Sequence, residues 1–146
     1  MACAPDPFSQ VMAVRILIAD DDAAIRRLLR RLIESHAGWS VCGDAEDGQD
    51  AVVKAGELGP DVVVLDLAMP QMNGLQAARE ISRNLPDTPM LLLTVQQVST
   101  ELNTEAAHGG FKGAVSKNTG SEVVRAIEVL LARQNFFPPI HSDAFA

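Results

Sequence analysis

The stretch VVVLDLAMPQMNG, residues 62–74, runs four apolar residues directly into an aspartate, Asp66. An unbroken run of Val and Leu, without polar alternation, is typical of a strand that is covered on both faces of a parallel sheet. Pro70 and Gly74 then break the regular structure. The stretch therefore predicts a buried strand with a carboxylate at its carboxyl end, and the rest of the chain must supply partners for that carboxylate.

The composition is that of one globular domain. The chain has 146 residues, of which 47% are hydrophobic and 21% are charged, so it can bury a core without needing a metal or a disulfide. The formal net charge of −7 makes it a poor binder of nucleic acid on its own, because phosphate backbones attract Lys and Arg. Residues 1–10 lack the apolar segment of a secretory signal, and the apolar run at 11–19 is too short to span a bilayer. We therefore expect a soluble, cytoplasmic protein that does not contact a membrane.

The cysteines and histidines show no metal-binding spacing. Cys3 and Cys42 are compatible with a disulfide or with two isolated thiols, and the second suits a reducing cytosol better. The three histidines lie far apart in the sequence, and we expect each at the surface or at a helix end: His36, His108 and His141.

Strand-like and helix-like segments alternate five times. Apolar runs predict strands at 14–19, 40–45, 61–67, 89–95 and 112–117, and amphipathic patterns predict helices at 23–35, 47–58, 73–85, 99–110 and 120–133. Short connections between such segments force parallel strands joined by right-handed crossovers. The fold class is therefore α/β, a doubly wound five-stranded parallel sheet with helices on both faces. Residues 1–12 are expected to be a disordered lead-in, 13–135 the domain, and 136–146 an irregular tail or the start of a linker.

The helix at 23–35 is strongly amphipathic. Its predicted inner stripe is Ile25, Leu28, Leu29, Leu32 and Ile33. Four arginines fall outside the stripe, and we expect them to form a solvated outer face rather than an anion site: Arg26, Arg27, Arg30 and Arg31.

Several polar side chains follow the predicted strands. In a parallel sheet the carboxyl ends of the strands share one edge, where ligands bind at the point at which strand order reverses. The residues at these ends are Asp20, Asp21, Asp22, Asp66, Thr94 and Lys117. Each alone is better explained as a helix cap or a solvated side chain. Together they predict a Mg²⁺ site with a nearby amine, which suits phosphoryl transfer, with an aspartate as a candidate nucleophile.

The same segments resemble the receiver domain of bacterial two-component response regulators. ILIADDD (16–22) is similar to the family's acidic-pair strand, and VVVLDLAMPQMNG to its phosphoacceptor segment. LLLTV (91–95) and GAVSK (113–117) are similar to its threonine and lysine strands. The likeness covers about residues 13–135, and the LDLxMPxMxG pattern is its most specific part. It implies a receiver-type, flavodoxin-like fold.

The resemblance also implies the roles of individual residues. Asp66 would be the phosphoacceptor, and Asp66, Asp21, Asp20 and the backbone carbonyl of Ala68 would hold Mg²⁺, Asp20 mostly through water. The phosphoryl group would be bound by Thr94 and Lys117, and the loop after the phosphoacceptor would be shaped by Pro70 and Gly74.

Two positions depart from the family pattern. Val95 stands where a small residue usually follows the threonine, and it could restrict access to the phosphoryl group and slow its loss. Ala114 stands where an aromatic residue usually turns inward on activation, and Phe111, three positions earlier, is the candidate substitute.

The resemblance further implies partners. A sensor histidine kinase would supply the phosphoryl group, and the face formed by the fourth helix (99–110), fifth strand (112–117) and fifth helix (120–133) would be the output surface, with homodimerisation as one use. AIEVLLARQNFFPPI (126–140) is similar to the end of NarL/FixJ-group receivers, which carry a LuxR-type helix-turn-helix after a linker. Contact with DNA would come only through such an output domain. An excised or truncated receiver is favoured over a chain that stands alone.

Three other functions compete with a phosphorylated receiver. An aspartyl-phosphate phosphohydrolase typically has a second acid two positions after its nucleophile, where this chain has Ala68, so we expect no enzyme and at most slow self-hydrolysis. A degenerate receiver that only binds proteins is kept open by Val95 and Ala114. A flavodoxin-like cofactor binder is disfavoured, because DDDAA after the first strand repels phosphate.

Overall fold

The computed structural model describes residues 13–95 and 98–137. The strands are β1 (Val14–Ala19), β2 (Trp39–Ala45), β3 (Val62–Asp66), β4 (Met90–Thr94) and β5 (Gly113–Ser116). The helices are α2 (Ala23–Glu34), α3 (Gly48–Leu58), α4 (Gly74–Asn84), α5 (Thr100–His108), the short 3-10 helix η1 (Lys117–Thr119) and α6 (Ser121–Leu131). The five predicted strand–helix repeats are confirmed, and their bounds shift by no more than two residues. The predicted lead-in at 1–12 lies outside the described residues.

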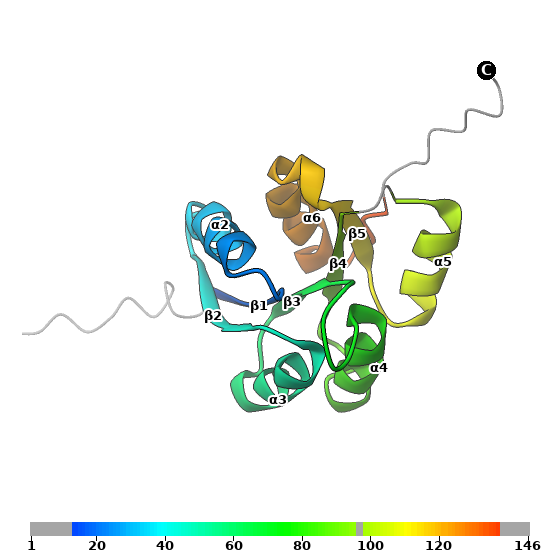
Figure 1. The fold of residues 1–146 in the computed structure, drawn as a ribbon. Coiled ribbons are helices and arrows are strands. Elements are labelled where there is room, and N and C mark those ends of the chain that lie inside the picture. The colour runs from blue at the N-terminus through cyan, green and yellow to red at the C-terminus, as the bar shows by residue number, and fades with distance from the viewer. Residues whose placement is uncertain (1–12, 96–97, 138–146) are drawn as a thin grey trace, which may run out of the picture.

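The five strands form one parallel sheet in the order β2-β1-β3-β4-β5. Helices α2 and α6 cover one face, and α3, α4 and α5 lie on the other side (Figure 1). The chain moves outward from β1 to β2, then returns to place β3 on the other side of β1. The switch in strand order therefore falls between β1 and β3, which is where a parallel sheet opens a crevice at its carboxyl edge.

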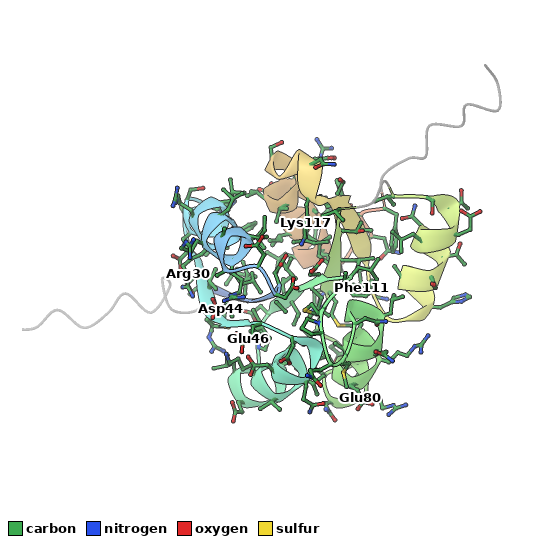
Figure 2. The ribbon with its side chains drawn as sticks, in the orientation of Figure 1. Arg30, Asp44, Glu46, Glu80, Phe111 and Lys117 are labelled. Atoms are coloured by element: carbon green, nitrogen blue, oxygen red, sulfur yellow. The ribbon has the colours of Figure 1, made fainter. Side chains whose placement is uncertain are left out.

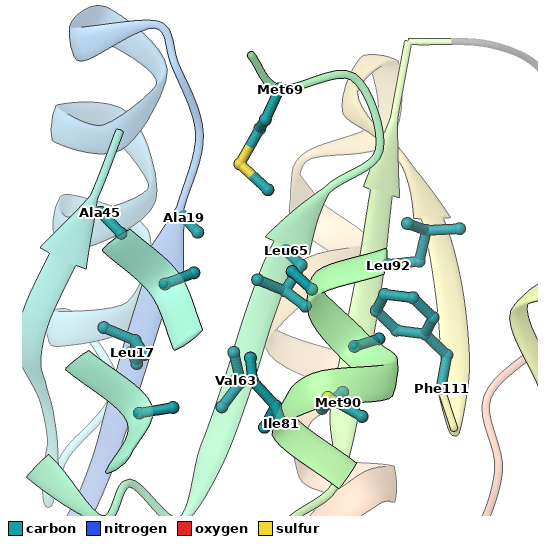
Figure 3. Close-up of a cluster of buried hydrophobic side chains, with 14 of the residues drawn as sticks. Leu17, Ala19, Ala45, Val63, Leu65, Met69, Ile81, Met90, Leu92 and Phe111 are labelled. Atoms are coloured by element: carbon teal, nitrogen blue, oxygen red, sulfur yellow. The ribbon is translucent and has the colours of Figure 1, made fainter. Parts of the chain in front are cut away.

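Each face of the sheet has its own apolar core. Alternate residues of the central strands point to opposite faces. One core, beneath α3, α4 and α5, includes Leu17, Leu65, Leu92 and Phe111, and Figure 3 shows the Phe111 ring beside Leu92. The second core, beneath α2 and α6, contains Ile16, Ile18, Val62, Val64, Leu91, Leu93 and Ile127. Burial on both sides explains why β3 and β4 read as continuous apolar runs.

The inner stripe of α2 is narrower than the sequence predicts. Leu29 and Ile33 are buried and Ile25 is partly buried, but the side chain of Leu28 is 47% exposed. The expectation for Leu28 was wrong: α2 packs over β1 and β2 with Ile25, Leu29 and Ile33 facing the core, and Leu28 lies outside that line.

Part of the predicted tail is docked on the sheet. The C-terminal strap, residues 134–137, follows a left-handed residue, Arg133 (φ 63°), that reverses the chain after α6. The Phe136 N–H donates to the Lys112 carbonyl at 2.8 Å, and the Ala114 N–H donates to the Phe136 carbonyl at 3.0 Å. Phe136 packs against the core under α2 and α6, and Phe137 against the opposite core. The strap therefore covers the outer edge of β5.

The thiol of Cys42 is free and partly buried, while Cys3 lies outside the described residues. Among the helices of the described ranges, none combines the length and apolar character that crossing a bilayer requires.

Candidate functional site

The carboxyl ends of four strands bring the predicted side chains together. Asp20 follows β1, Asp66 ends β3, Thr94 ends β4 and Lys117 follows β5. Asp20, Asp66 and Thr94 are all buried, with exposed fractions of 0%, 3% and 1%. Three polar side chains buried at one end of an otherwise apolar sheet point to a functional site, because uncompensated burial of a charge is costly.

Lys117 joins the two buried carboxylates. Its Nζ lies 2.6 Å from Asp20 Oδ2 and 3.1 Å from Asp66 Oδ1, and its side chain is 13% exposed. Figure 2 shows Lys117 above the middle of the sheet, although it follows the edge strand β5. The predicted meeting of Lys117 with the acidic residues of distant strands is therefore observed.

Asp21 completes an acidic cluster. Carboxylate oxygens of Asp20, Asp21 and Asp66 lie within 4.8 Å of one another. Asp21 is exposed, unlike the other two. Its neighbour Asp22 turns away to cap α2, accepting a hydrogen bond from the Ala24 N–H at 2.8 Å. Of the three aspartates after β1, two therefore belong to the cluster and the third starts the helix.

The surroundings shift the ionisation of this cluster. Burial, and then the Asp20 carboxylate, raise the pKa of Asp66 despite the opposing effect of Lys117 and of a hydrogen bond from the Ala68 backbone. Burial lowers the pKa of Lys117, but hydrogen bonds and charge attraction to Asp20 and Asp66 outweigh it and the pKa is raised. The lysine therefore stays charged, and the ionised form of Asp66 is disfavoured by burial and by the neighbouring negative charge of Asp20.

The loop after β3 leaves room for no side chain at Gly74. A Cβ built there would lie 2.3 Å from the Asp66 carbonyl oxygen, and the Gly74 N–H donates to the Leu67 carbonyl at 2.9 Å. Asn73 and Gln76 form a reciprocal capping box that starts α4 at this point. Pro70 and Ala68 lie exposed on the loop. The loop thus folds back tightly beneath Asp66.

The donor set fits a hard divalent cation. Three carboxylates supply oxygen ligands of the kind that Mg²⁺ prefers, and one of them is exposed, which leaves room for water or phosphate oxygens. Lys117 balances only part of their charge. A further cation would relieve the remaining repulsion.

The two departures from the family pattern have different environments. The side chain of Val95 is 65% exposed, next to buried Thr94. Ala114 is fully buried, and Phe111, the candidate substitute for an aromatic at that position, is 1% exposed within the core.

One residue beside the site was missed. The Arg26 side chain, expected on the solvated face of α2, is only 18% exposed, and its Nε lies 3.3 Å from Asp44 Oδ2. Its Nη1 also donates to the Asp20 carbonyl at 2.6 Å. The amphipathic pattern could not separate Arg26 from its neighbours, because the β1–β2 register, not the helix, places Asp44 beside it.

Comparison with known proteins gives one consistent result. The family model for the response regulator receiver domain matches residues 16–128. Response regulator GacA of Pseudomonas viridiflava is 34% identical over 127 residues, 86% of this chain and 59% of that protein. Transcriptional regulatory protein YdfI of Bacillus subtilis is 39% identical over 110 residues, 75% of this chain and 51% of that protein. The chain thus spans little more than half the length of these relatives.

The same similarity is present in three dimensions. The crystal structure of a LuxR-family two-component response regulator from an Aurantimonas species superposes with a TM-score of 0.83 at 34% identity, covering 87% of this chain and 91% of that one.

Proposed function

The chain belongs to the response regulator receiver domain family of two-component signalling, and on that basis we propose that Asp66 accepts a phosphoryl group. The observation that carries the proposal is the Lys117 ammonium placed within 3.1 Å of Asp66 and 2.6 Å of Asp20. A cation held at the nucleophile can neutralise an incoming phosphoryl oxygen. No other aspartate in the described ranges combines burial, a lysine partner and a place in the acidic cluster together with the end position of a central strand.

The reaction is a transfer between two carriers. A carboxylate oxygen of Asp66 forms a new bond to phosphorus while the bond from phosphorus to its donor breaks, leaving an acyl phosphate on the protein. Lys117 would then pair with a phosphoryl oxygen, and the Thr94 hydroxyl, which ends the neighbouring strand, would donate to another. Pro70 and Gly74 would keep the loop after β3 tight enough to present Asp66 at the rim.

Mg²⁺ would be held by Asp20, Asp21 and Asp66 together with the Ala68 carbonyl. When bound, it supplies neutralising charge for the phosphoryl oxygens during transfer. Asp21 suits direct ligation because its carboxylate is exposed, whereas the Asp20 carboxylate is already engaged by Lys117 and by the Asp22 N–H.

The partner would be a sensor histidine kinase, which is the donor that this family implies. We place the chain in the NarL/FixJ (LuxR-type) group, supported by its likeness to the LuxR-family regulator from Aurantimonas. Its output would be transcriptional, through a DNA-binding domain, with the face formed by α5, β5 and α6 as the output and dimerisation surface.

Turnover as a phosphatase is not expected. A phosphohydrolase of this chemistry typically carries a second acid two residues after the nucleophile, and that position is Ala68. The acyl phosphate should therefore be lost only slowly by hydrolysis. Sustained release of phosphate over many turnovers from a small phosphodonor would contradict this.

The deciding experiment is incubation with acetyl phosphate and Mg²⁺, followed by intact mass spectrometry. The parent should gain one phosphoryl group, and the gain should disappear with EDTA and in Asp66→Asn. Asp87→Asn, the same change at an exposed position between α4 and β4, is the matched control and should label normally. Equal labelling of Asp66→Asn and the parent would place the phosphoryl group elsewhere.

A further inference from the structure

Arg26 is hydrogen-bonded to the turn that carries two of the three clustered carboxylates. It lies in the first turn of α2, and its guanidinium reaches back to the Asp20 carbonyl and sideways to the Asp44 carboxylate near the end of β2. Figure 2 labels Asp44 in this region of the molecule. One planar group therefore ties together α2, the end of β1 and the end of β2.

The Asp20 carbonyl needs a donor from outside the sheet. The pairing of β1 with β2 and β3 ends at Ala19, and the Asp20 N–H still finds the Ala45 carbonyl at 3.0 Å. Its carbonyl lies beyond that ladder and receives the Arg26 side chain instead. A buried carbonyl without a donor would be costly, so the turn would rearrange if Arg26 were lost.

The position of this carbonyl sets the position of the acidic side chains. Asp20 Oδ1 accepts the Asp22 N–H at 2.9 Å, so the Asp20 side chain and the turn that follows it are hydrogen-bonded to each other. Asp21 lies between these two residues and carries the exposed carboxylate of the cluster. Rotation of the peptide after Asp20 would move the Asp21 carboxylate relative to Asp66.

We propose that Arg26 is a positioning residue for the divalent cation: it holds the turn at residues 20–22 so that the carboxylates of Asp20, Asp21 and Asp66 converge. The inference rests on the proposed function, because it assumes that this cluster binds Mg²⁺. Groups outside the ligand set that orient the ligands typically change metal affinity by about tenfold or more.

The direction in which Mg²⁺ affinity changes distinguishes a positioning role of Arg26 from a purely electrostatic one. Arg26 is a cation hydrogen-bonded to the backbone of Asp20, one of the cluster residues, so removing its charge alone would tighten Mg²⁺ binding. Loss of positioning would weaken it. Arg26→Lys keeps the charge but not the planar fork that serves Asp20 and Asp44 at once, so only positioning predicts weaker binding in this variant.

The test is a Mg²⁺ titration of the parent, Arg26→Lys, Arg26→Met and Arg30→Met, followed by amide NMR shifts, with urea unfolding as a check on folding. Arg30, one turn further along α2, contacts Glu34 and the Val41 carbonyl and loses the same charge, so it is the matched control. We expect both Arg26 variants to bind Mg²⁺ about tenfold more weakly and Arg30→Met to bind like the parent. In the metal-free protein, hydrogen exchange of the Asp22 amide should be faster in Arg26→Lys.

Unchanged or tighter Mg²⁺ binding in Arg26→Lys, or unchanged exchange at Asp22, overturns the assignment. Equal weakening in Arg30→Met also overturns it, because the loss of Mg²⁺ affinity would then come from general destabilisation of α2 and not from the contacts of Arg26. If the parent binds no Mg²⁺, the proposed metal site itself fails. If the parent binds Mg²⁺ and the Arg26 variants bind it equally well, the metal site stands and only the role of Arg26 fails. Should Arg26→Met not fold, Arg26→Lys retains the charge and carries the test.

Discussion

Replacing Asp66 with asparagine should stabilise the metal-free protein at neutral pH. Asp66 is 3% exposed, and its carboxylate lies within 4.8 Å of the Asp20 and Asp21 carboxylates. An asparagine side chain has nearly the same shape and no charge, while the Asp20–Lys117 pair at 2.6 Å stays intact. The substitution therefore removes a buried, repelled charge without leaving the lysine unpaired.

The expected gain follows from three opposing contributions. At an effective dielectric constant of about 20, attraction across the 3.1 Å between Lys117 and Asp66 is worth roughly 5 kcal/mol. Repulsion from the buried Asp20 carboxylate across 4.8 Å or less costs at least roughly 3.5 kcal/mol, while water weakens the repulsion from the exposed Asp21 carboxylate. Withdrawing the Asp66 carboxylate from water costs several kcal/mol more. The net cost of the charge is about 2 kcal/mol, which corresponds to a rise in Tm of about 6 °C for a chain of this size.

The gain should depend on pH in a defined direction. The folded-state pKa of Asp66 is raised above its ordinary value of 3.8, chiefly by burial and by Asp20. For a carboxyl group shifted upward, the folded state is favoured while the group is protonated, and that advantage is lost as pH rises through 3.8 and the folded-state pKa. The difference between Asp66→Asn and the parent should therefore be small below pH 3.8 and reach its full size above the folded-state pKa.

The assay is thermal unfolding by circular dichroism in EDTA at several pH values, with Asp87→Asn as the control for the chemical change. Titration with Mg²⁺ should then stabilise the parent more than Asp66→Asn, which narrows the gap. A Tm at neutral pH that is unchanged or lower in Asp66→Asn would refute the electrostatic reasoning, as would a gain of equal size at every pH.

Three further outcomes can be checked. Gly74→Ala should lower the free energy of unfolding in urea by at least about 2 kcal/mol and reduce phosphoryl labelling, because its Cβ would meet the Asp66 carbonyl at 2.3 Å. Gly56→Ala, in open space on α3, should instead stabilise the protein by up to about 1 kcal/mol. Similar costs at both sites would contradict this. Phe136→Ala should cost about 1–3 kcal/mol and speed hydrogen exchange at the Ala114 amide, which donates to the strap. Unchanged exchange at Ala114 would show that the strap is not held there. Burial raises the pKa of the Cys42 thiol. In a variant lacking the other cysteine, Cys42 should therefore react slowly with a disulfide reagent at about pH 7 and faster in urea. Equal reaction rates with and without urea would contradict the raised pKa.

Local patterns in the sequence were enough to predict the elements. Apolar runs, helical periodicity and the breaks at proline and glycine are properties of a few neighbouring residues, and all five strands lie within two residues of their predicted positions. The alternation of strand and helix then leaves few topologies, because crossovers are short and right-handed. This is why the ends of four strands could be expected at one edge, and why Asp66 and Lys117 were expected to meet.

Patterns of the same kind could not predict which side chains of one helix are buried and which are exposed. Leu28 has the spacing of an inner residue but is 47% exposed, and Arg26 has the spacing of an outer residue but is 18% exposed. Both outcomes depend on where α2 crosses the sheet edge and on the register of β2. The strap was missed for a similar reason, since Phe136 pairs with Gly113, which lies far away in the sequence.

By itself, the amino-acid sequence determined the order of the elements, the parallel sheet and the set of polar residues that end its strands, because these follow from local hydrophobic periodicity and chain connectivity. Packing of the folded chain is what buries Asp20 and Asp66 while leaving Asp21 exposed, places one lysine against both buried carboxylates, and turns Arg26 inward. Those properties depend on ångström-scale distances and exclusion of water, which arise only when segments distant in the sequence pack together.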